Sequence, residues 1–348
     1  MLNINDNDCF VIAEAGVNHN GSFELAKKLI DAAVEAGADA VKFQTFKAEE
    51  LVTEDAEMAG YQKNNTGKKQ SQLKMLKELE LSYKDFEALK KYCDKKGILF
   101  LSSPHTSDAV DFLDRLVPAF KIGSGDLTNI PFLRKVAKKG KPVILSTGMS
   151  YLHEVKEAIE VLKDCEITLL HCTTSYPCPR EDVNLKAMET LAKETGLQVG
   201  YSDHTLGIDV SLMAAKRGAV IIEKHFTIDN SMKGPDHKAS LNPKQLKELI
   251  VRIKSKNYPN DEEIVLGSSE KKPTVQEIEN AKVARKSVVA LRDISKGETL
   301  SDINIGIKRP GLGLAPRFYY DIIGKKSTGK IKKDSYVKWN NLRKSDTK

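Results

Sequence analysis

Two histidines follow two short apolar runs at the same spacing. The runs Q-V-G-Y and V-I-I read as β-strands, and each continues with a polar residue and then a histidine, Ser202 with His204 and Glu223 with His225. Residues i and i+2 of a strand point to the same face, so neighbouring strands would bring the two histidines together. Two imidazoles beside anion-binding groups indicate a divalent metal site. The alternative is two strand-end histidines that are hydrogen bonded to the backbone.

Two lysines lie inside other strand-like runs. Lys42 and Lys121 would be costly to bury unless each meets an anion, so together they indicate a phosphate or carboxylate ligand. The G-S-G turn at 123–125 would let backbone N–H groups and a hydroxyl approach that anion closely. The alternative is structural, with both lysines paired to Glu14 or Glu223 to hold the strands together.

The elements that must position these residues alternate along the chain. Short apolar runs are each followed by a segment with helical spacing, and glycines stand where several of these helices would stop. Nearly continuous apolar strands flanked by helices are typical of a parallel sheet. The eight runs are 9–13, 40–43, 98–101, 119–122, 142–145, 167–170, 198–201 and 220–222.

Eight strand–helix units within residues 1–254 predict an α/β fold, a closed (β/α)8 TIM barrel. A doubly wound open sheet is the alternative, and the absence of G-x-G-x-x-G after the first run favours the barrel. Active sites of such barrels lie at the carboxyl ends of the strands. Every run here ends in polar or glycine-rich residues, among them S-S-P, G-S-G-D, S-T-G-M and H-C-T-T-S-Y-P.

Three other segments differ from this pattern. The connection 47–81 is long and polar at its centre, Y-Q-K-N-N-T-G-K-K-Q-S-Q, and is either a lid or an exposed insertion. Residues 255–281 lose the helical period and read as a linker. Residues 282–348 contain short strand-like runs and turns, which predict a small β-rich domain. Its motif K-R-P-G-L-G places Arg309 beside a rigid turn, where an exposed side chain is the simplest expectation.

The composition is that of an ordinary globular protein. The 348 residues are 40% hydrophobic and 30% charged, with a net charge of +7 that suits an anionic substrate. The lysines are spread over helix-like segments without interleaved arginine and aromatic residues, so no nucleic acid partner is expected. Five cysteines without C-x-x-C spacing, no signal peptide and no membrane-length apolar run indicate a cytoplasmic protein that does not bind membranes.

Taken together, the motifs resemble those of the sialic acid (nonulosonate) synthase family. The matching elements are A-E-A-G-V-N-H-N-G, V-K-F-Q-T, K-I-G-S-G-D, I-L-S-T-G-M, H-C-T-T-S-Y-P, G-Y-S-D-H-T, E-K-H-F-T, G-P-D-H-K-A-S-L and K-R-P-G, in family order over nearly the whole chain. The resemblance implies a (β/α)8 barrel followed by a C-terminal domain similar to type III antifreeze protein, the SAF domain. It also implies a homodimer in which the small domain is exchanged and covers the partner's active site.

The same resemblance implies the reaction. Members of the family condense phosphoenolpyruvate with an N-acylated amino sugar of the 2-acetamido mannose type and release phosphate. His204 and His225 would hold a divalent ion, Mn2+ first and Mg2+ or Co2+ as alternatives. The expected catalytic residues are Glu14, His204, His225 and Asp236, and the expected substrate-binding residues are Lys42, Gln44, Ser103, Lys121, Ser124, Asp126, Thr174, Tyr176, Ser202 and Arg309.

Two positions depart from N-acetylneuraminate synthases, which commonly carry Glu and Asn where this chain has Asp126 and Thr174. The motifs G-S-G-D-L-T-N, Y-Q-K-N-N-T and G-P-D-H-K-A-S-L are more similar to synthases of N,N'-diacetyllegionaminic acid. That substrate is therefore our first expectation, and N-acetylneuraminate is the alternative. Readings from other classes are a lyase that uses Lys42 or Lys121 as a Schiff base and a non-catalytic carbohydrate-binding protein.

Overall fold

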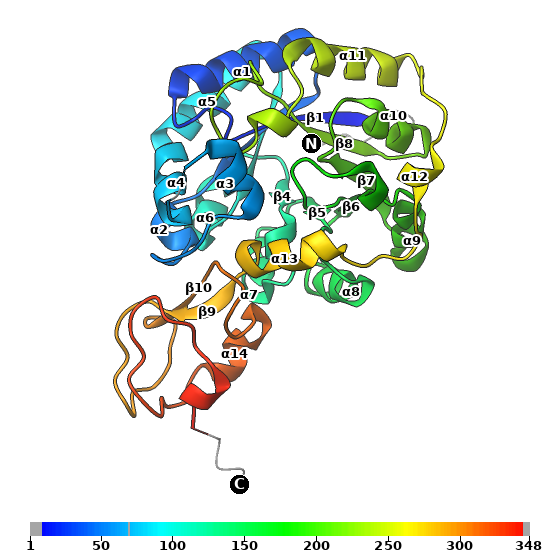
Figure 1. The fold of residues 1–348 in the computed structure, drawn as a ribbon. Coiled ribbons are helices and arrows are strands. Elements are labelled where there is room, and N and C mark those ends of the chain that lie inside the picture. The colour runs from blue at the N-terminus through cyan, green and yellow to red at the C-terminus, as the bar shows by residue number, and fades with distance from the viewer. Residues whose placement is uncertain (1–8, 69, 344–348) are drawn as a thin grey trace.

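The computed structural model describes residues 9–68 and 70–343 as a barrel with a small domain attached below it (Figure 1). Eight parallel strands are hydrogen bonded in the order β3-β2-β1-β8-β7-β6-β5-β4, and β3 also lies against β4. The sheet therefore closes on itself, which confirms the predicted (β/α)8 barrel. The strands are β1 (Phe10–Gly16), β2 (Ala40–Thr45), β3 (Leu99–Pro104), β4 (Phe120–Ile122), β5 (Val143–Ser146), β6 (Ile167–His171), β7 (Gln198–Asp203) and β8 (Ile221–His225).

Helices form the outer layer of the barrel because each has one apolar stripe that packs on the strands. They are α1 (Phe23–Ala36), α5 (Tyr83–Lys96), α6 (Ser107–Asp114), α7 (Ile130–Ala137), α8 (Leu152–Val161), α9 (Lys186–Thr195), α10 (Asp209–Lys216) and α11 (Pro243–Lys254). Their ends follow local sequence. In α1, for example, the Ser22 side chain accepts a hydrogen bond from Leu25 N, and Gly37 ends the helix at a φ of 82° that glycine tolerates best.

The barrel interior has two layers that follow from strand periodicity. A plug of apolar side chains fills the amino-terminal half: Ile12, Ala40, Leu101, Ile144, Leu170 and Ile221. Since side chains two residues apart share a face, the next inward position on these strands is in turn Glu14, Lys42, Ser103, Ser146, Cys172 and Glu223. The polar layer of the barrel therefore lies directly on top of its apolar plug.

The long connection between β2 and α5 is folded. It contains α2 (Ala48–Leu51), α3 (Gly60–Thr66) and α4 (Gln72–Leu79), and it buries its own cluster of apolar side chains, including Phe46, Met58 and Met75. The polar stretch Y-Q-K-N-N-T forms most of α3. This segment lies beside the carboxyl ends of the strands, with α3 and α4 next to the barrel mouth (Figure 1).

The expected linker also contains helices, α12 (Glu263–Leu266) and α13 (Val275–Ala284). Helix α13 crosses the boundary that the sequence suggested at residue 281. It begins at Val275, because Thr274 and Glu277 form a capping box. Figure 1 shows α13 lying between the barrel strands and the small domain.

The small domain is built on an antiparallel pair, β9 (Ser287–Ala290) and β10 (Ile305–Lys308), with α14 (Tyr319–Ile322) and an apolar core of its own. Tyr336 bridges to Val289, and Trp339 begins a short 3-10 helix. Among the described residues, no helix is both long enough and apolar enough to cross a lipid bilayer.

Candidate active site

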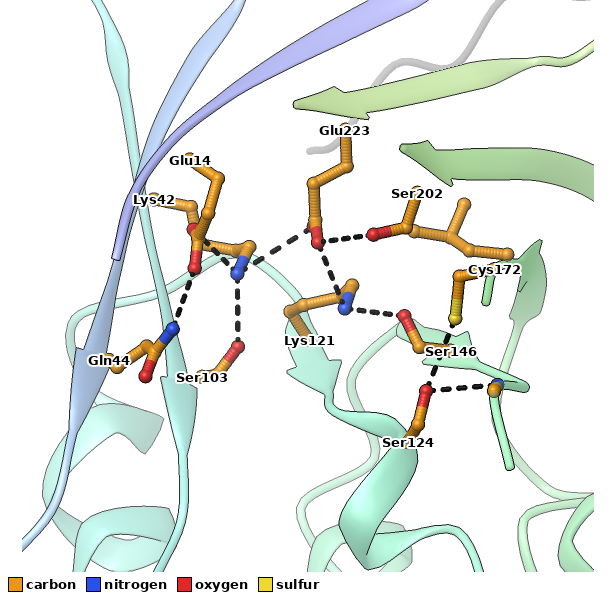
Figure 2. Close-up of polar contacts among 12 residues, drawn as sticks. Glu14, Lys42, Gln44, Ser103, Lys121, Ser124, Ser146, Cys172, Ser202 and Glu223 are labelled. Atoms are coloured by element: carbon orange, nitrogen blue, oxygen red, sulfur yellow. Dashed lines mark hydrogen bonds and ion pairs between the residues drawn. The ribbon is translucent and has the colours of Figure 1, made fainter. Parts of the chain in front are cut away.

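Two buried carboxylates and two buried lysines form the floor of a cavity at the carboxyl end of the barrel (Figure 2). The register of β1 and β2 pairs Glu14 with Lys42, and Lys42 Nζ lies 2.6 Å from Glu14 Oε2 and 3.7 Å from Glu223 Oε2. The Lys42 ammonium also donates to Ser103 Oγ at 3.3 Å, and Gln44 Nε2 donates to Glu14 Oε1 at 3.1 Å. Each polar group on the floor therefore has a partner of opposite charge or a hydrogen bond.

Lys121 completes this network from the opposite wall. Its Nζ donates to Ser146 Oγ at 2.7 Å and lies 3.3 Å from Glu223 Oε1, which also accepts from Ser202 Oγ at 3.1 Å. The alternative in which the lysines pair with Glu14 and Glu223 thus describes this structure. The same ammonium groups also line the cavity, so they remain accessible to an anionic ligand.

The two carboxyl groups of the floor differ in the direction in which their pKa is shifted. Burial raises the pKa of Glu14 above its ordinary value, although the charge of Lys42 opposes this shift. At Glu223 burial acts in the same direction, but Lys121 and Lys42 outweigh it and hold the pKa below the ordinary range. Glu223 is therefore the permanent counter-charge of the lysines, and Glu14 is the carboxyl that can carry a proton. The pKa of Lys42 is lowered by burial but raised more by these carboxylates, so Lys42 stays charged and is poorly suited to Schiff-base formation.

A small polar cluster follows β4 and β5. Ser124 Oγ accepts a hydrogen bond from Gly148 N at 2.9 Å and lies 3.2 Å from Cys172 Sγ. A Cβ atom at Gly148 would lie 2.3 Å from Thr174 Oγ1 and 2.8 Å from Ser124 Oγ, so only glycine fits there. Three strand ends thereby approach closely enough to place hydroxyl groups at one wall.

The two histidines converge as their spacing predicted. The ring centroids of His204 and His225 lie 5.7 Å apart at the mouth of the barrel. Burial lowers the pKa of His204 to about 4, and burial together with His204 lowers the pKa of His225 well below its ordinary value, so both rings are neutral near pH 7. His204 Nδ1 lies 2.7 Å from the carbonyl oxygen of Thr173, which leaves Nε2 free as a ligand.

A fully buried ion pair supports this arrangement from outside the barrel. Lys224 lies between Glu223 and His225 on β8, points away from the cavity and places Nζ 2.7 Å from Asp203 Oδ2. Asp203 Oδ1 accepts from Thr205 N at 2.8 Å, and this bond fixes the turn that carries His204. Neutral imidazoles with free nitrogens fit a divalent ion. Over residues 9–68 and 70–343 no cluster of three or more His, Cys, Asp or Glu side chains is placed to hold one, so water or substrate would complete the ligand set.

The mouth of the cavity combines aromatic side chains with an acidic one. The Tyr176 ring lies 4.2 Å from that of His204 and 4.9 Å from that of Tyr61, measured between centroids. Tyr61 comes from α3, so the 47–81 segment forms part of the wall. Burial and the charge of Glu14 raise the pKa of Asp236, which also lines the cavity, to about 7. A carboxyl with this pKa can both donate and accept a proton near neutral pH.

Arg309 of the small domain also reaches the cavity. Its backbone N–H donates to Leu51 O at 2.9 Å, and its carbonyl accepts from Thr53 N at 3.0 Å, so the turn after β10 is pinned against the end of α2. The expectation of an exposed arginine is therefore wrong. In the described chain the Arg309 side chain enters the cavity of its own barrel.

The cavity contains all but one of the residues expected from the sequence. Those lining it are Glu14, Lys42, Gln44, Ser103, Lys121, Ser124, Thr174, Tyr176, Ser202, His204, His225, Asp236 and Arg309. The exception is Asp126, which we expected to face the substrate. Asp126 is turned away and pairs with Lys286 of the small domain at 2.7 Å, because the 3-10 turn after β4 directs its side chain into the domain boundary.

Several residues of the site were not among those expected. Ser146 ends β5, so the rule that strand ends carry the site would have identified it. Tyr61 lies in the connection 47–81, which was predicted as either a lid or an exposed insertion, and it begins the motif Y-Q-K-N-N-T that is part of the resemblance. Asn280 lies in the expected linker, where the sequence gives no signal of a site. They become part of the cavity only because α3 and α13 fold over the strand ends.

Comparisons with known proteins agree with this geometry. The NeuB family matches residues 29–264, and the SAF domain matches residues 285–343. The chain is 47% identical to an N,N'-diacetyllegionaminic acid synthase of Campylobacter jejuni, with 94% of this chain and 98% of that protein covered. It is 46% identical to the N,N'-diacetyllegionaminic acid synthase of Legionella pneumophila, with 96% and 94% covered.

Among solved structures, the spore coat polysaccharide biosynthesis protein SpsE of Bacillus subtilis superimposes with a TM-score of 0.82 at 34% identity, over 97% of this chain and 96% of that one. A barrel with a polar strand-end cavity, a C-terminal SAF domain and near full-length similarity all point to one assignment. The chain belongs to the NeuB family of nonulosonic (sialic-type) acid synthases.

Proposed function

We propose that this protein condenses phosphoenolpyruvate with 2,4-diacetamido-2,4,6-trideoxymannose to form N,N'-diacetyllegionaminic acid and phosphate. The observation that carries the proposal is the identity of 46–47% with two legionaminic acid synthases over more than nine tenths of the chain. The cavity supplies the chemical support, since its charged floor and neutral histidines suit an anionic donor and a polarised aldehyde.

Charge balance supports phosphoenolpyruvate as the donor. In the described chain the charges of Lys42 and Lys121 are compensated by Glu14 and Glu223, and Arg309 adds a further positive charge at the cavity wall. Phosphoenolpyruvate carries roughly three negative charges, which the uncompensated charge of Arg309 and that of a divalent ion would balance.

His204 and His225 are the residues that would hold the divalent ion, with Mn2+ as the first choice and Mg2+ or Co2+ as alternatives. Their neutral state, the free Nε2 of His204 and the 5.7 Å separation of the rings support this role. When bound, such an ion acts as a Lewis acid toward the sugar aldehyde.

The protein's own residues then account for the proton transfers. The C3 carbon of phosphoenolpyruvate forms a bond to the aldehyde carbon, and the aldehyde oxygen takes up a proton, for which Asp236 has a suitable pKa of about 7. C2 becomes electron deficient and is stabilised by the carboxylate of Glu14. Water adds at C2 and gives one proton to Glu14. The bond between C2 and the phosphate oxygen then breaks, and the proton of the new C2 hydroxyl leaves with the phosphate as the keto group forms.

We further propose that the active form is a homodimer with exchanged small domains, as the family resemblance implies. Within one chain Arg309 contacts its own cavity, and exchange would preserve the same contact between two chains.

The decisive experiment measures phosphate release from phosphoenolpyruvate with Mn2+, comparing 2,4-diacetamido-2,4,6-trideoxymannose with N-acetylmannosamine. We expect a clear preference for the first sugar. A preference for N-acetylmannosamine would make the chain an N-acetylneuraminate synthase instead. The absence of release with either sugar, equal to that of a Lys121→Met control, would favour a carbohydrate-binding protein and contradict the proposal.

A further inference from the structure

The helix α13 belongs to neither of the two matched regions, because these cover residues 29–264 and 285–343. It nevertheless crosses the barrel beside the ends of β5 and β6 (Figure 1), and Asn280, Val283 and Ala284 line the cavity. A carbonyl oxygen of α13, that of Ala284, lies only 2.8 Å from where a Cβ of Gly125 would stand. The segment is therefore fitted closely to the site and does more than connect two domains.

Glu277 is the principal contact between α13 and the barrel. Its side chain is almost completely buried, at 1% exposure, and Oε1 accepts hydrogen bonds from Met149 N at 2.7 Å and from Thr174 N at 2.8 Å. Oε2 accepts from Thr274 N at 3.0 Å. A single carboxylate thus joins the loops that follow β5 and β6 to the start of α13, through charge-assisted bonds that are stronger than neutral ones.

Two further side chains of the same segment hold the carbonyl groups of these residues. Asn280 Nδ2 donates to Thr174 O at 2.7 Å, and Arg285 donates to Met149 O at 2.8 Å. Arg285 is itself fixed by two bonds of 2.8 Å to Glu154. The N–H and C=O groups of both Met149 and Thr174 are therefore hydrogen bonded to side chains of α13 or of Arg285, the residue after it.

Met149 needs this support. Its φ of 58° is left-handed, a conformation that costs a residue with a side chain about 1–2 kcal/mol. Such a conformation persists only when its surroundings determine it. The hydrogen bonds to Glu277 and from Arg285 hold the Met149 backbone in this conformation. Met149 also lines the cavity.

The Thr174 hydroxyl is the group of this arrangement that is left to bind a ligand. Thr174 lines the cavity, and its buried Oγ1 has no hydrogen-bond partner within the described chain, while its backbone is held on both sides. A buried hydroxyl without a partner is costly, so it is best explained as a group that binds a ligand.

We propose that Glu277 is a positioning residue of the synthase, which, with Asn280, fixes the Thr174 hydroxyl so that it binds the amino-sugar acceptor. This inference rests on the proposed function. The donor-binding lysines are held by other groups, which are Glu14, Glu223, Ser103 and Ser146. None of these four side chains forms a hydrogen bond or an ion pair with α13 in the described chain. Loss of Glu277 should therefore affect the acceptor far more than phosphoenolpyruvate.

The test is Glu277→Gln, which keeps the shape but removes the charge and one acceptor oxygen, so that the side chain can no longer accept hydrogen bonds from Met149 N, Thr174 N and Thr274 N together. We expect the KM of the diacetamido sugar to rise about tenfold or more, from the loss of one or two hydrogen bonds to a charged group, with the KM of phosphoenolpyruvate changed less than about twofold. Glu279→Gln is the matched control, because Glu279 lies on the exposed face of α13 and, among residues 9–68 and 70–343, forms an ion pair only with Lys282, at 2.6 Å. It should change neither constant.

Two additional variants make the result decisive. Asn280→Ala should raise the acceptor KM in the same way, and it decides the question if Glu277→Gln does not fold. In a Thr174→Val background the effect of Glu277→Gln on the acceptor KM should disappear, because the group that it positions is gone. Equal rises of both KM values, no rise, or a full effect in the Thr174→Val background would overturn the inference.

Amide hydrogen exchange separates this inference from the proposed function. Glu277→Gln should accelerate exchange at Met149 and Thr174 without a matching change elsewhere in the barrel, whatever the substrate. If the wild-type protein does not turn over the diacetamido sugar, the proposed function fails, and unchanged exchange at these two amides would then reject the role of Glu277 separately.

Discussion

The ammonium nitrogen of Lys286 lies 2.7 Å from Oδ1 of Asp126, and this ion pair joins the small domain to the barrel beside the cavity. The two side chains are 3% and 1% exposed, and Lys286 also donates to the carbonyl oxygen of His105 at 2.6 Å. A charge pair buried this deeply is sensitive to the loss of either partner, since the remaining charge is left without compensation. Asp126 therefore helps to fix the small domain that carries Arg309.

Lys286→Met should lower the free energy of unfolding by about 3–5 kcal/mol, because it leaves the Asp126 carboxylate buried and unpaired. The double variant Asp126→Asn/Lys286→Met should recover most of this loss, as measured by urea denaturation. At Asp126 burial raises the pKa, but Lys286 outweighs it and holds the pKa below the ordinary 3.8. The stabilisation is thus fully present above pH 3.8 and is lost as the pH falls through the lower folded pKa. A Lys286→Met protein as stable as wild type at pH 7 would contradict this account.

Lys121→Met should abolish most of the activity by removing one of two cations on the cavity floor. We expect kcat/KM for phosphoenolpyruvate to fall about 100-fold or more, the range seen when a preorganised charge is removed from a site. Lys135→Met is the matched control, since Lys135 forms a partly exposed pair with Asp111 and should matter little for rate or stability. Comparable steady-state kinetics for the two variants would refute the role of Lys121.

His225→Ala should prevent the binding of Mn2+, since an ion held by two imidazoles loses half of its protein ligands. Electron paramagnetic resonance of free Mn2+ at increasing protein concentration measures this without any substrate. His153→Ala provides the comparison, because His153 is exposed and stacks on Tyr151 away from the cavity. Equal Mn2+ binding by wild type and the His225→Ala variant would place the ion elsewhere.

Asp236→Asn should change the pH dependence in a defined direction. Because burial raises the folded pKa of Asp236 to about 7, the folded state holds a proton that the unfolded state releases near pH 3.8. Wild-type stability therefore declines between about pH 4 and pH 7 on account of this group, and the loss is complete above pH 7. The Asn variant should gain Tm relative to wild type at pH 8 but not at pH 4. It should also lose the inflection near pH 7 in the kcat/KM profile, and an unchanged profile would remove Asp236 from the proton transfers.

Mixing two inactive variants tests whether the small domain is exchanged. A Lys121→Met chain and an Arg309→Ala chain, co-expressed with different tags, form mixed dimers that can be purified. With exchange, one of the two cavities combines an intact floor with an intact Arg309, so activity should return. Without exchange every cavity carries one defect, and the mixed dimer should be as inactive as its parents.

The barrel and its polar strand ends could be predicted from local sequence. Strand periodicity of two places Glu14, Lys42 and Glu223 on the inner face whenever Ile12, Ala40 and Ile221 form the plug. In the same way the equal spacing of Ser202 with His204 and of Glu223 with His225 predicted that the rings converge. These features depend on short-range geometry and on the parallel register of neighbouring strands, both of which the apolar pattern specifies.

Contacts between distant segments were decided only by the tertiary structure. Asp126 lies in a motif that resembles a substrate-binding one. Its carboxylate nevertheless forms an ion pair with Lys286, which follows 160 residues later in the sequence. In the sequence Glu277 looks like part of a charged linker. Its burial against Met149 and Thr174 depends on how α13 packs against the barrel. Sequence periodicity reports which face of an element is buried, whereas the partner of a buried polar group depends on how separately formed elements pack.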